Sequence, residues 1–316
     1  MLSLHTNAAS LSAQNSLTRT QTSLSTSMTR LSTGYRINSA MDDAAGLQIA
    51  TRLKAQTSGM AVAMRNTQNS ISMLQTAEGS LSEVNNILVR MKDLATQAAD
   101  GSSSDTDRTA MQTEYDSLGK ELSNIVANTK FGGTELLNTS TGKLKASIDF
   151  QIGSDKSEKM TADFSTDLST MATDISTTSG AFSSTASSTV TAAGTEIASS
   201  TAATTGFISD GTSTTPSNGT VLSSGANAAI GNLSSAIDAV STLRSKLGAV
   251  SNRLDHVYNN LSNISSNTQA ATGRIMDVDF ATESSSMTSN QMLMQAGTAM
   301  LKQTNSMSSM VMSLLQ

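Results

Sequence analysis

The sequence predicts a mainly α-helical fold: a long antiparallel coiled-coil or helical-bundle rod built from both chain ends, with a β-hairpin region and a small Ser/Thr-rich outer insert. Three observations predict this class. Apolar residues recur every three or four positions over long stretches of both halves, which is the period of packed helices. One short segment, 143–153, alternates between polar and apolar side chains, as a half-buried strand does. Residues 176–224 are dominated by Ser, Thr, Ala and Gly and have no long apolar period.

Each chain end carries an apolar stripe that repeats about every seven residues. No third helical stripe lies next to either end in the sequence to cover it. Burying one Leu or Met stabilises a protein by roughly 1.5–3 kcal/mol. We therefore expect the two ends to pair with each other and then with other copies of the chain. The residues expected in this inter-subunit core are Leu17, Leu24, Met28, Leu31, Met287, Leu293, Met294, Met300, Leu301, Met307, Val311 and Leu314.

A break follows the first helix in the sequence RLSTGYRINSAMDDAAGLQIATRL, residues 30–53. Gly34 can adopt the left-handed conformation that ends a helix. Ser39 is a good N-cap for the next helix, with Asp42 three residues on as in a capping box. Asp42 and Asp43 would then lie in the first turn, where the helix dipole favours negative charge, and Gly46 allows close backbone approach. The stretch predicts a joint between a terminal helix and a bundle. A metal site at the aspartates is the weaker alternative, because no His or Glu stands at ligand spacing.

Three more stripes predict the helices of the bundle. The first runs from 53 to 98 with one skipped residue, and the second from 111 to 129. Between them DGSSSDTD breaks the helix, with Gly101 suited to the helix end and Asp105 or Asp107 to the next start. The third stripe, 226–278, has a mean period of 3.5 residues and, as one helix, would be about 80 Å long at 1.5 Å per residue. The three helices can bury one another's apolar faces.

The segment KLKASIDFQIG, residues 143–153, predicts a strand, and the preceding TSTGK predicts a hairpin turn. The Ser/Thr-rich residues 176–224 are expected to be a weakly ordered insert or, alternatively, a small outer domain of short strands. The resulting division is an inner-core domain of residues 1–42 and 276–316, a helical rod domain of 43–160 and 226–275, and a variable surface-exposed insert of 161–225.

Composition argues against several classes of function. The 316 residues include no Cys and no Trp, so thiolate chemistry is excluded. The net charge is −5 and no basic stripe exists for nucleic acid. No apolar run is long enough to span a membrane, and we expect no cleaved secretory signal. With His5 and His256 as the only histidines, no catalytic constellation can be singled out. The sequence therefore predicts no enzyme, no cofactor and no metal site.

The stretch 30–53 closely resembles bacterial flagellin, as does GRIMDVDFATESSSMTSNQMLMQAGTAML…SLLQ within residues 273–316. The resemblance covers the chain up to Leu137 and again from Leu233. It implies a structural subunit that self-assembles into the helical flagellar filament used for swimming, with the terminal helices innermost and the insert outward. It also implies export by the flagellar type III apparatus to the cell exterior. The implied partners are an export chaperone on the C-terminal helix, the filament cap and hook-associated proteins.

The same resemblance implies a recognition patch and a modified surface. LVRMKDLATQA, residues 88–98, is similar to a segment that innate Toll-like receptors read in some flagellins, with Arg90, Leu94 and Glu114 at the matching positions. Val89 and Met91 depart from the commonest version. The alternatives are helix packing for Leu94, and a solvated face or a subunit contact for the two charged residues. Ser and Thr residues within 176–224 are expected O-glycan acceptors, as in several flagellins.

Two rival functions stay open beside the filament subunit. A hook–filament junction protein has similar terminal coiled coils, but the near-complete C-terminal signature favours the filament subunit. A coiled-coil adhesin or signalling rod would need a membrane span or anchor, and the sequence offers none.

Overall fold

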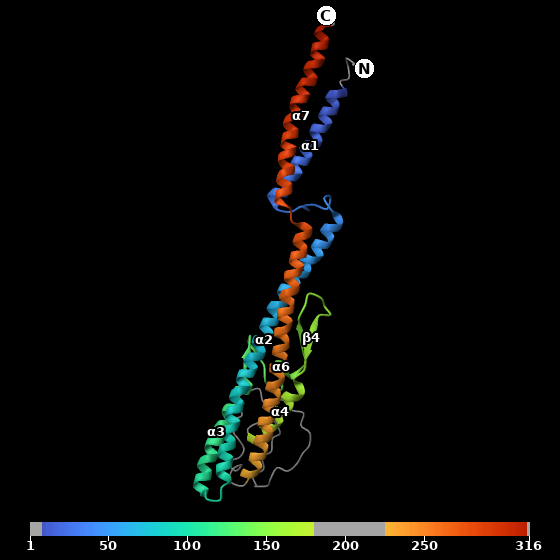
Figure 1. Cartoon of the computed structure of the whole chain (residues 1–316). Helices are drawn as coiled ribbons and strands as arrows, with labels where there is room; N and C mark the ends of the chain where they lie inside the picture. The colour runs from blue at the N-terminus through green and yellow to red at the C-terminus, as the bar shows by residue number, and fades with distance from the viewer. Residues whose placement is uncertain (1–7, 180–224, 315–316) are drawn as a thin grey trace. The chain divides into compact units, whose positions relative to one another are not determined.

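The computed structural model describes residues 8–179 and 225–314, without the side chains of 179 and 307–314, and it confirms the mainly α-helical class (Figure 1). Its helices are α1 (Ala8–Thr33), α2 (Ala44–Ala99), α3 (Asp105–Asn128), α4 (Ser165–Ser179), α6 (Ala226–Met276) and α7 (Phe280–Leu314). Two compact units are present. The terminal unit consists of Met1–Ser58 and Asn263–Gln316, and the central unit of Gly59–Ser262.

The terminal unit pairs α1 with α7 in antiparallel directions. Ser10 Oγ donates a hydrogen bond to Asn305 Oδ1 at 3.4 Å near one end, and Arg30 lies 3.6 Å from the Glu283 carboxylate near the other. The residue numbers of contacting partners total between 313 and 315, so a single register holds along the pair. The covered positions on both helices recur every three or four residues, as in a coiled coil. They are Ser10, Ala13, Leu17, Thr20, Leu24, Ser27 and Leu31 on α1, and Glu283, Met287, Asn290, Met294, Gly297, Leu301 and Thr304 on α7.

The central unit has a large apolar core to which α2, α3, α4, α6 and the β region contribute, and a smaller separate cluster of Met60, Ala63 and Leu261. The predicted stripe on α6 is confirmed up to Leu261, with Ala229, Leu233, Ala236, Val240, Leu243, Leu247 and Leu254 among its buried residues. Beyond this point Ile264 is exposed, and the helix ends at Met276, before Val278. Helix α3 begins at Asp105, and its N-cap is Ser104 rather than the expected Asp105 or Asp107. Ser104 accepts from the Asp107 N–H, and Asp107 accepts in return from the Ser104 N–H, which completes a capping box.

The strand predicted over 143–153 is shorter in the structure, and it pairs with a strand that follows it rather than with a segment that precedes it. Within this predicted strand, residues 143–145 form a 3₁₀ turn, η1 (Lys143–Lys145), and only Ile148–Gln151 form a strand, β3. Its partner is the following strand, β4 (Lys159–Ala162), with Ile148 opposite Ala162. The predicted TSTGK hairpin is wrong because Asn138 closes that segment on itself: its Oδ1 accepts from the Ser140 N–H, and its carbonyl accepts from the Gly142 N–H at 2.7 Å.

A second hairpin, not predicted from the sequence, joins β1 (Lys130–Phe131) to β2 (Thr134–Glu135). Gly132 and Gly133 have φ values of 57° and 81°. Two successive residues with positive φ are what a tight two-residue turn between antiparallel strands requires. The glycine pair in FGGTELLN is therefore the sequence signal for this turn.

The expected insert of 161–225 starts later in the structure than the sequence suggested. Residues up to Ala162 belong to β4, and Phe164 and the helix α4 after it contribute fully buried side chains to the core of the central unit. These are Phe164, Leu168, Met171 and Ile175, spaced as one helix face. The Ser and Thr residues around them hid this stripe. Of the expected glycan acceptors, Ser176 and Thr177 lie on α4, Thr178 is buried, and 180–224 lie outside the described residues.

Candidate functional site

The terminal helix pair leaves apolar side chains uncovered, and this is the first feature of the candidate site. Small or polar residues occupy much of the seam between α1 and α7. Leu17 Cδ1 lies only 3.1 Å from the point where a β-carbon on Gly297 would stand, so the helices approach closely there. Several large apolar side chains consequently face away from the seam. The exposed ones include Leu11 at 56%, Met28 at 53%, Leu293 at 57% and Met300 at 66%.

The predicted inter-subunit residues therefore fall into three groups. The first is buried or half-buried within the pair: Leu24 is buried, and Leu17, Leu31, Met287, Met294 and Leu301 are half-buried. The second is exposed: Met28, Leu293 and Met300. The third, Met307, Val311 and Leu314, belongs to the part of α7 whose side chains are outside the described residues. Met292, 60% exposed, lies on the same helix and was not selected from the sequence, because it falls between the two predicted rows.

The breaks between the helices of the terminal unit are joined by main-chain hydrogen bonds. The Arg36 N–H donates to the Met276 carbonyl at 2.6 Å, and the Val278 N–H donates to the Gly34 carbonyl at 3.0 Å. The Arg36 guanidinium also donates to the Ile275 carbonyl at 2.9 Å. A short two-stranded bridge thus connects the link after α1 to the link after α6.

Gly34 has the left-handed conformation expected for a helix end, with φ of 75°. Its N–H donates to the Arg30 carbonyl at 2.9 Å, which satisfies a carbonyl of the last turn of α1. Its own carbonyl is the acceptor for Val278. One residue therefore ends α1 and anchors the bridge to the second link.

The expected N-cap at Ser39 is wrong. Helix α2 begins at Ala44, and Asp43 caps it by accepting a hydrogen bond from the Gly46 N–H at 2.8 Å. Asp42 instead closes a turn before the helix, where its carboxylate accepts from the N–H groups of Ser39 at 2.8 Å and Asn38 at 3.0 Å. These bonds to the charged form lower the pKa of Asp42. The later start places both aspartates outside the first turn.

Gly46 occupies a crowded position at the start of α2. A β-carbon there would overlap the Asp43 carboxylate and stand 2.8 Å from Ile37 Cδ1. Ile37 itself is only 2% exposed, so the link between α1 and α2 contributes a buried apolar side chain. Ile37 was not predicted from the sequence, although it is the lone aliphatic residue of YRINS.

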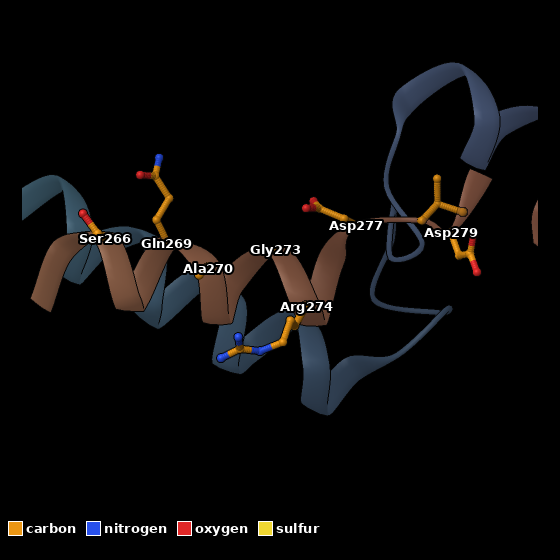
Figure 2. A pocket seen from close by; sticks show the side chains of 8 residues that line it. Ser266, Gln269, Ala270, Gly273, Arg274, Asp277 and Asp279 are labelled. Atoms are coloured by element: carbon orange, nitrogen blue, oxygen red, sulfur yellow. The ribbon is translucent and has the colours of Figure 1, made fainter. Parts of the chain in front are cut away.

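The shorter link, 277–279, borders a shallow surface hollow (Figure 2). Its lining residues are Ser266, Gln269, Ala270, Gly273, Arg274, Asp277, Val278 and Asp279. Asp279 caps α7: its carboxylate accepts from the Thr282 hydroxyl at 2.8 Å and from the Ala281 N–H at 3.0 Å, and these bonds lower its pKa. A β-carbon at Gly273 would come within 2.7 Å of Asp277 Oδ2. The hollow presents charged and amide groups beside the N-cap of α7.

The residues of the expected receptor patch lie in the central unit and differ in exposure. Arg90 donates to Glu114 Oε1 from Nε at 2.9 Å and from Nη2 at 2.7 Å. The side chains of this ion pair between α2 and α3 are about half exposed. Leu94 is only 2% exposed and belongs to the core.

An ion pair between α2 and α6 was not predicted from the sequence. Glu78 interrupts the apolar stripe of α2, and its carboxylate accepts from Arg244 on α6 at 2.7 Å and 3.1 Å. A lone charge inside a stripe was the available signal, but the partner cannot be chosen without the register of the two helices.

Within the part of the chain that the structure describes, no helix has the length and apolarity needed to cross a membrane. Across those same residues, no three His, Asp or Glu side chains converge as a metal site would require.

Comparison with known proteins adds a consistent similarity at both ends and over the full length. The N-terminal helical region of bacterial flagellin matches residues 4–141, and the C-terminal helical region matches residues 230–315. Flagellin A of Vibrio anguillarum is 36% identical and Flagellin A of Vibrio cholerae O395 is 34% identical, each aligned over 100% of both chains. Among solved structures, the crystal structure of Bacillus cereus flagellin is 29% identical, with a TM-score of 0.43, covering 66% of this chain and 94% of that chain.

Proposed function

The chain belongs to the bacterial flagellin family, and from this premise we propose that it is a structural subunit of the flagellar filament that polymerises through the outward-facing apolar side chains of α1 and α7. Identical surfaces that meet head to tail without closing produce a helical polymer. The family is a structural one, so the proposed activity is assembly rather than catalysis. The filament would serve swimming motility outside the cell.

The main support for this proposal is that large apolar side chains of α1 and α7 stay exposed when the two helices pair. Met28, Leu293 and Met300 are each more than half exposed in the isolated chain. Covering one such side chain stabilises an assembly by roughly 1.5–3 kcal/mol. Several on each subunit give copies of the chain a strong tendency to associate along the terminal helices.

We assign residues 1–42 and 276–316 to the inner core of the filament, 43–160 and 226–275 to a helical rod domain, and the insert to the outer surface. In this arrangement the stretch containing Gly34, Ser39, Asp42, Asp43 and Gly46 is the connector to the rod. The bridge between the links supports this role, since it fixes the chain where α1 ends and α7 begins.

The remaining partners follow from the need to keep the apolar surface covered before assembly. An export chaperone would cover the exposed face of α7, including Leu293 and Met300, inside the cell. Export through the flagellar type III apparatus would deliver the chain to the growing end, where the filament cap and hook-associated proteins meet it.

We also propose the Arg90–Glu114 pair as part of a surface that an innate Toll-like receptor contacts. The pair is half exposed and offers both charges on neighbouring helices. Arg90→Ala should reduce the response of receptor-expressing reporter cells, whereas Lys92→Ala on the same helix should not. Equal responses to both variants would assign the pair a structural role.

The Ser and Thr residues of 176–224, apart from the buried Thr178, stay predicted O-glycan acceptors. Filaments isolated from the native host should give an intact mass above that of the bare chain, and a mass equal to the bare chain would exclude the modification.

Seeded elongation tests the proposed function. Purified chain is added to sheared filament fragments, and growth is followed by light scattering and electron microscopy. A filament subunit elongates the seeds, a junction protein adds a short ring at most, and an adhesin or signalling rod adds nothing. Removing residues 1–40 or 276–316 should leave a monomer that no longer elongates. Continued growth by either truncated chain would refute the role of the terminal helices.

A point substitution makes the test specific to the exposed face. Leu293→Gln replaces an outward apolar side chain with a polar one, and we expect the critical concentration for elongation to rise more than about tenfold. Gln291→Ala, at an exposed polar position of the same helix, is the matched control and should change it less than about twofold. Similar effects from the two substitutions would show that Leu293 is not buried between subunits.

A further inference from the structure

Methionine is the sulfur-containing residue of this chain, which has 18 Met and no Cys. The described Met side chains differ widely in exposure. Some are covered almost completely, among them Met60 at 2%, Met91 at 0% and Met171 at 0%. Others are more than half exposed: Met28 at 53%, Met41 at 97%, Met292 at 60% and Met300 at 66%. Oxidation of a thioether requires access of the oxidant to sulfur, so these two classes should react at different rates.

Three of the exposed thioethers lie on the terminal helices, Met28 on α1 and Met292 and Met300 on α7. Met41 lies instead in the link between α1 and α2. We propose that Met28, Met292 and Met300 are oxidation sites of the free subunit, and that their conversion to sulfoxides by a peroxide stops the subunit from adding to a filament. This inference rests on the proposed function, since the same side chains would be covered by other subunits.

The chemistry is a two-electron oxygen transfer. A lone pair on the methionine sulfur attacks one oxygen of hydrogen peroxide, the S–O bond forms as the O–O bond breaks, and water leaves after proton transfer. Sulfur is oxidised to the sulfoxide and the peroxide is reduced. The product is polar and chiral, and methionine sulfoxide reductases return it to the thioether.

The sulfoxide oxygen would oppose assembly because of the place that it would occupy in the filament. A sulfoxide in the exposed face of the free subunit is hydrated, but in an assembled filament it would be buried among apolar side chains. A buried polar group without a hydrogen-bond partner is unfavourable. We therefore expect oxidation to reduce subunit addition at least tenfold, while the fold of the central unit, with Met60, Met91 and Met171 covered, stays intact.

The order of oxidation is the first part of the test. Free subunit is treated with hydrogen peroxide for increasing times, and peptide mapping by mass spectrometry follows the added oxygen at each Met. Met41, Met28, Met292 and Met300 should react well before Met60, Met91 and Met171. In assembled filaments the sites on the terminal helices should be protected. Equal rates in free and assembled subunits at Met28, Met292 and Met300 would overturn the proposal.

Seeded elongation by treated subunit is the second part. The wild-type rate should fall at least tenfold after treatment, which corresponds to about 1.4 kcal/mol, and treatment with methionine sulfoxide reductases A and B should restore it. A variant with Met28, Met292 and Met300 replaced by Leu should keep its own untreated rate after peroxide. The control Met41→Leu should stay as sensitive as the wild type.

The outcomes separate the inference from the proposed function. If untreated wild type does not elongate seeds, the proposed function fails. If it elongates and keeps elongating with sulfoxides mapped at the three sites, the oxidation proposal alone fails. Loss of elongation that the reductases do not reverse also overturns it. Should the triple variant itself elongate poorly, the wild-type reversal decides the question.

Discussion

Gly34→Ala tests whether the end of α1 and the bridge between the links depend on one left-handed residue. Gly34 has φ of 75°, and nothing lies within 4 Å of an added β-carbon. The substitution therefore introduces no clash, and its cost is the left-handed backbone itself, about 1–2 kcal/mol for an ordinary L-residue. Since 1.4 kcal/mol corresponds to a factor of ten, the bridge should open about 5- to 30-fold more often.

Hydrogen exchange of the free subunit measures this opening. The Arg36 and Val278 amides donate across the bridge, and their exchange reports its local stability. Both should exchange faster in Gly34→Ala by the factor above. Gly34→Asn should have a smaller effect, because Asn tolerates the left-handed region better than other side chains do.

A matched control separates backbone strain from the general effect of a Gly-to-Ala change. Gly231 lies inside α6 and also has nothing within 4 Å of an added β-carbon, but its φ is not in the left-handed range. Gly231→Ala should stabilise the helix by about 0.5–1 kcal/mol and leave exchange at the bridge unchanged. If Gly34→Ala leaves the exchange of Arg36 and Val278 as slow as in the wild type, the reasoning about the joint is refuted.

Three further predictions follow from the core and the caps. Leu247→Ala removes a fully buried side chain and should lower the free energy of unfolding of the central unit by about 2–5 kcal/mol in urea titration; a loss below 1 kcal/mol would contradict its burial. Tyr115→Phe leaves the buried Thr178 carbonyl without its 2.8 Å donor, so exchange at the end of α4 should rise, and unchanged exchange would show the bond to be dispensable. The lowered pKa values of Asp42 and Asp279 mean that their stabilisation of the joint is present at neutral pH and is lost as pH falls below about 4, through the lowered folded-state pKa values. Bridge-amide protection followed against pH should show this loss in wild type and a smaller one in Asp279→Asn, and equal loss in both would remove Asp279 from the explanation.

The long helices could be predicted because their apolar periods are long. The stripe of α6 extends over many heptads, and each repeat adds independent support for the same helix. Helix α4 was not predicted because its buried side chains, and that of Phe164 just before it, stand among Ser and Thr residues of the kind that dominate the following segment. In such a background the helical spacing of Phe164, Leu168, Met171 and Ile175 is short and easily overlooked.

The start of α2 shows a different limit of prediction from the sequence. Ser39 and Asp42 have the spacing of a capping box, and they do bond to one another, since the Ser39 N–H donates to Asp42. The same local pattern also suits a turn that precedes a helix. Two features instead place the start of the helix at Ala44: the Gly46 N–H donates to Asp43, and Ile37 packs closely against Gly46. That approach depends on packing between residues nine positions apart, which local cap rules do not contain.

The outward apolar side chains could be foreseen as a group but not individually. The sequence shows two rows of Leu and Met on α7 and cannot say which row faces α1. In the structure, Met287, Met294 and Leu301 face the seam, whereas Leu293 and Met300 do not. Close approach at Gly297 and the end contacts Ser10–Asn305 and Arg30–Glu283 fix the register of the two helices, and this register determines which row faces α1.

The two links of the terminal unit differ in length and in how they are held. Ten residues, 34–43, separate α1 from α2, but only three, 277–279, separate α6 from α7. The longer link contains the turn that Asp42 closes and the buried side chain of Ile37. The shorter link contains Asp279, which caps α7. Because the Arg36 and Val278 N–H groups donate across the bridge, the longer link is held both by its own turn and by the bridge.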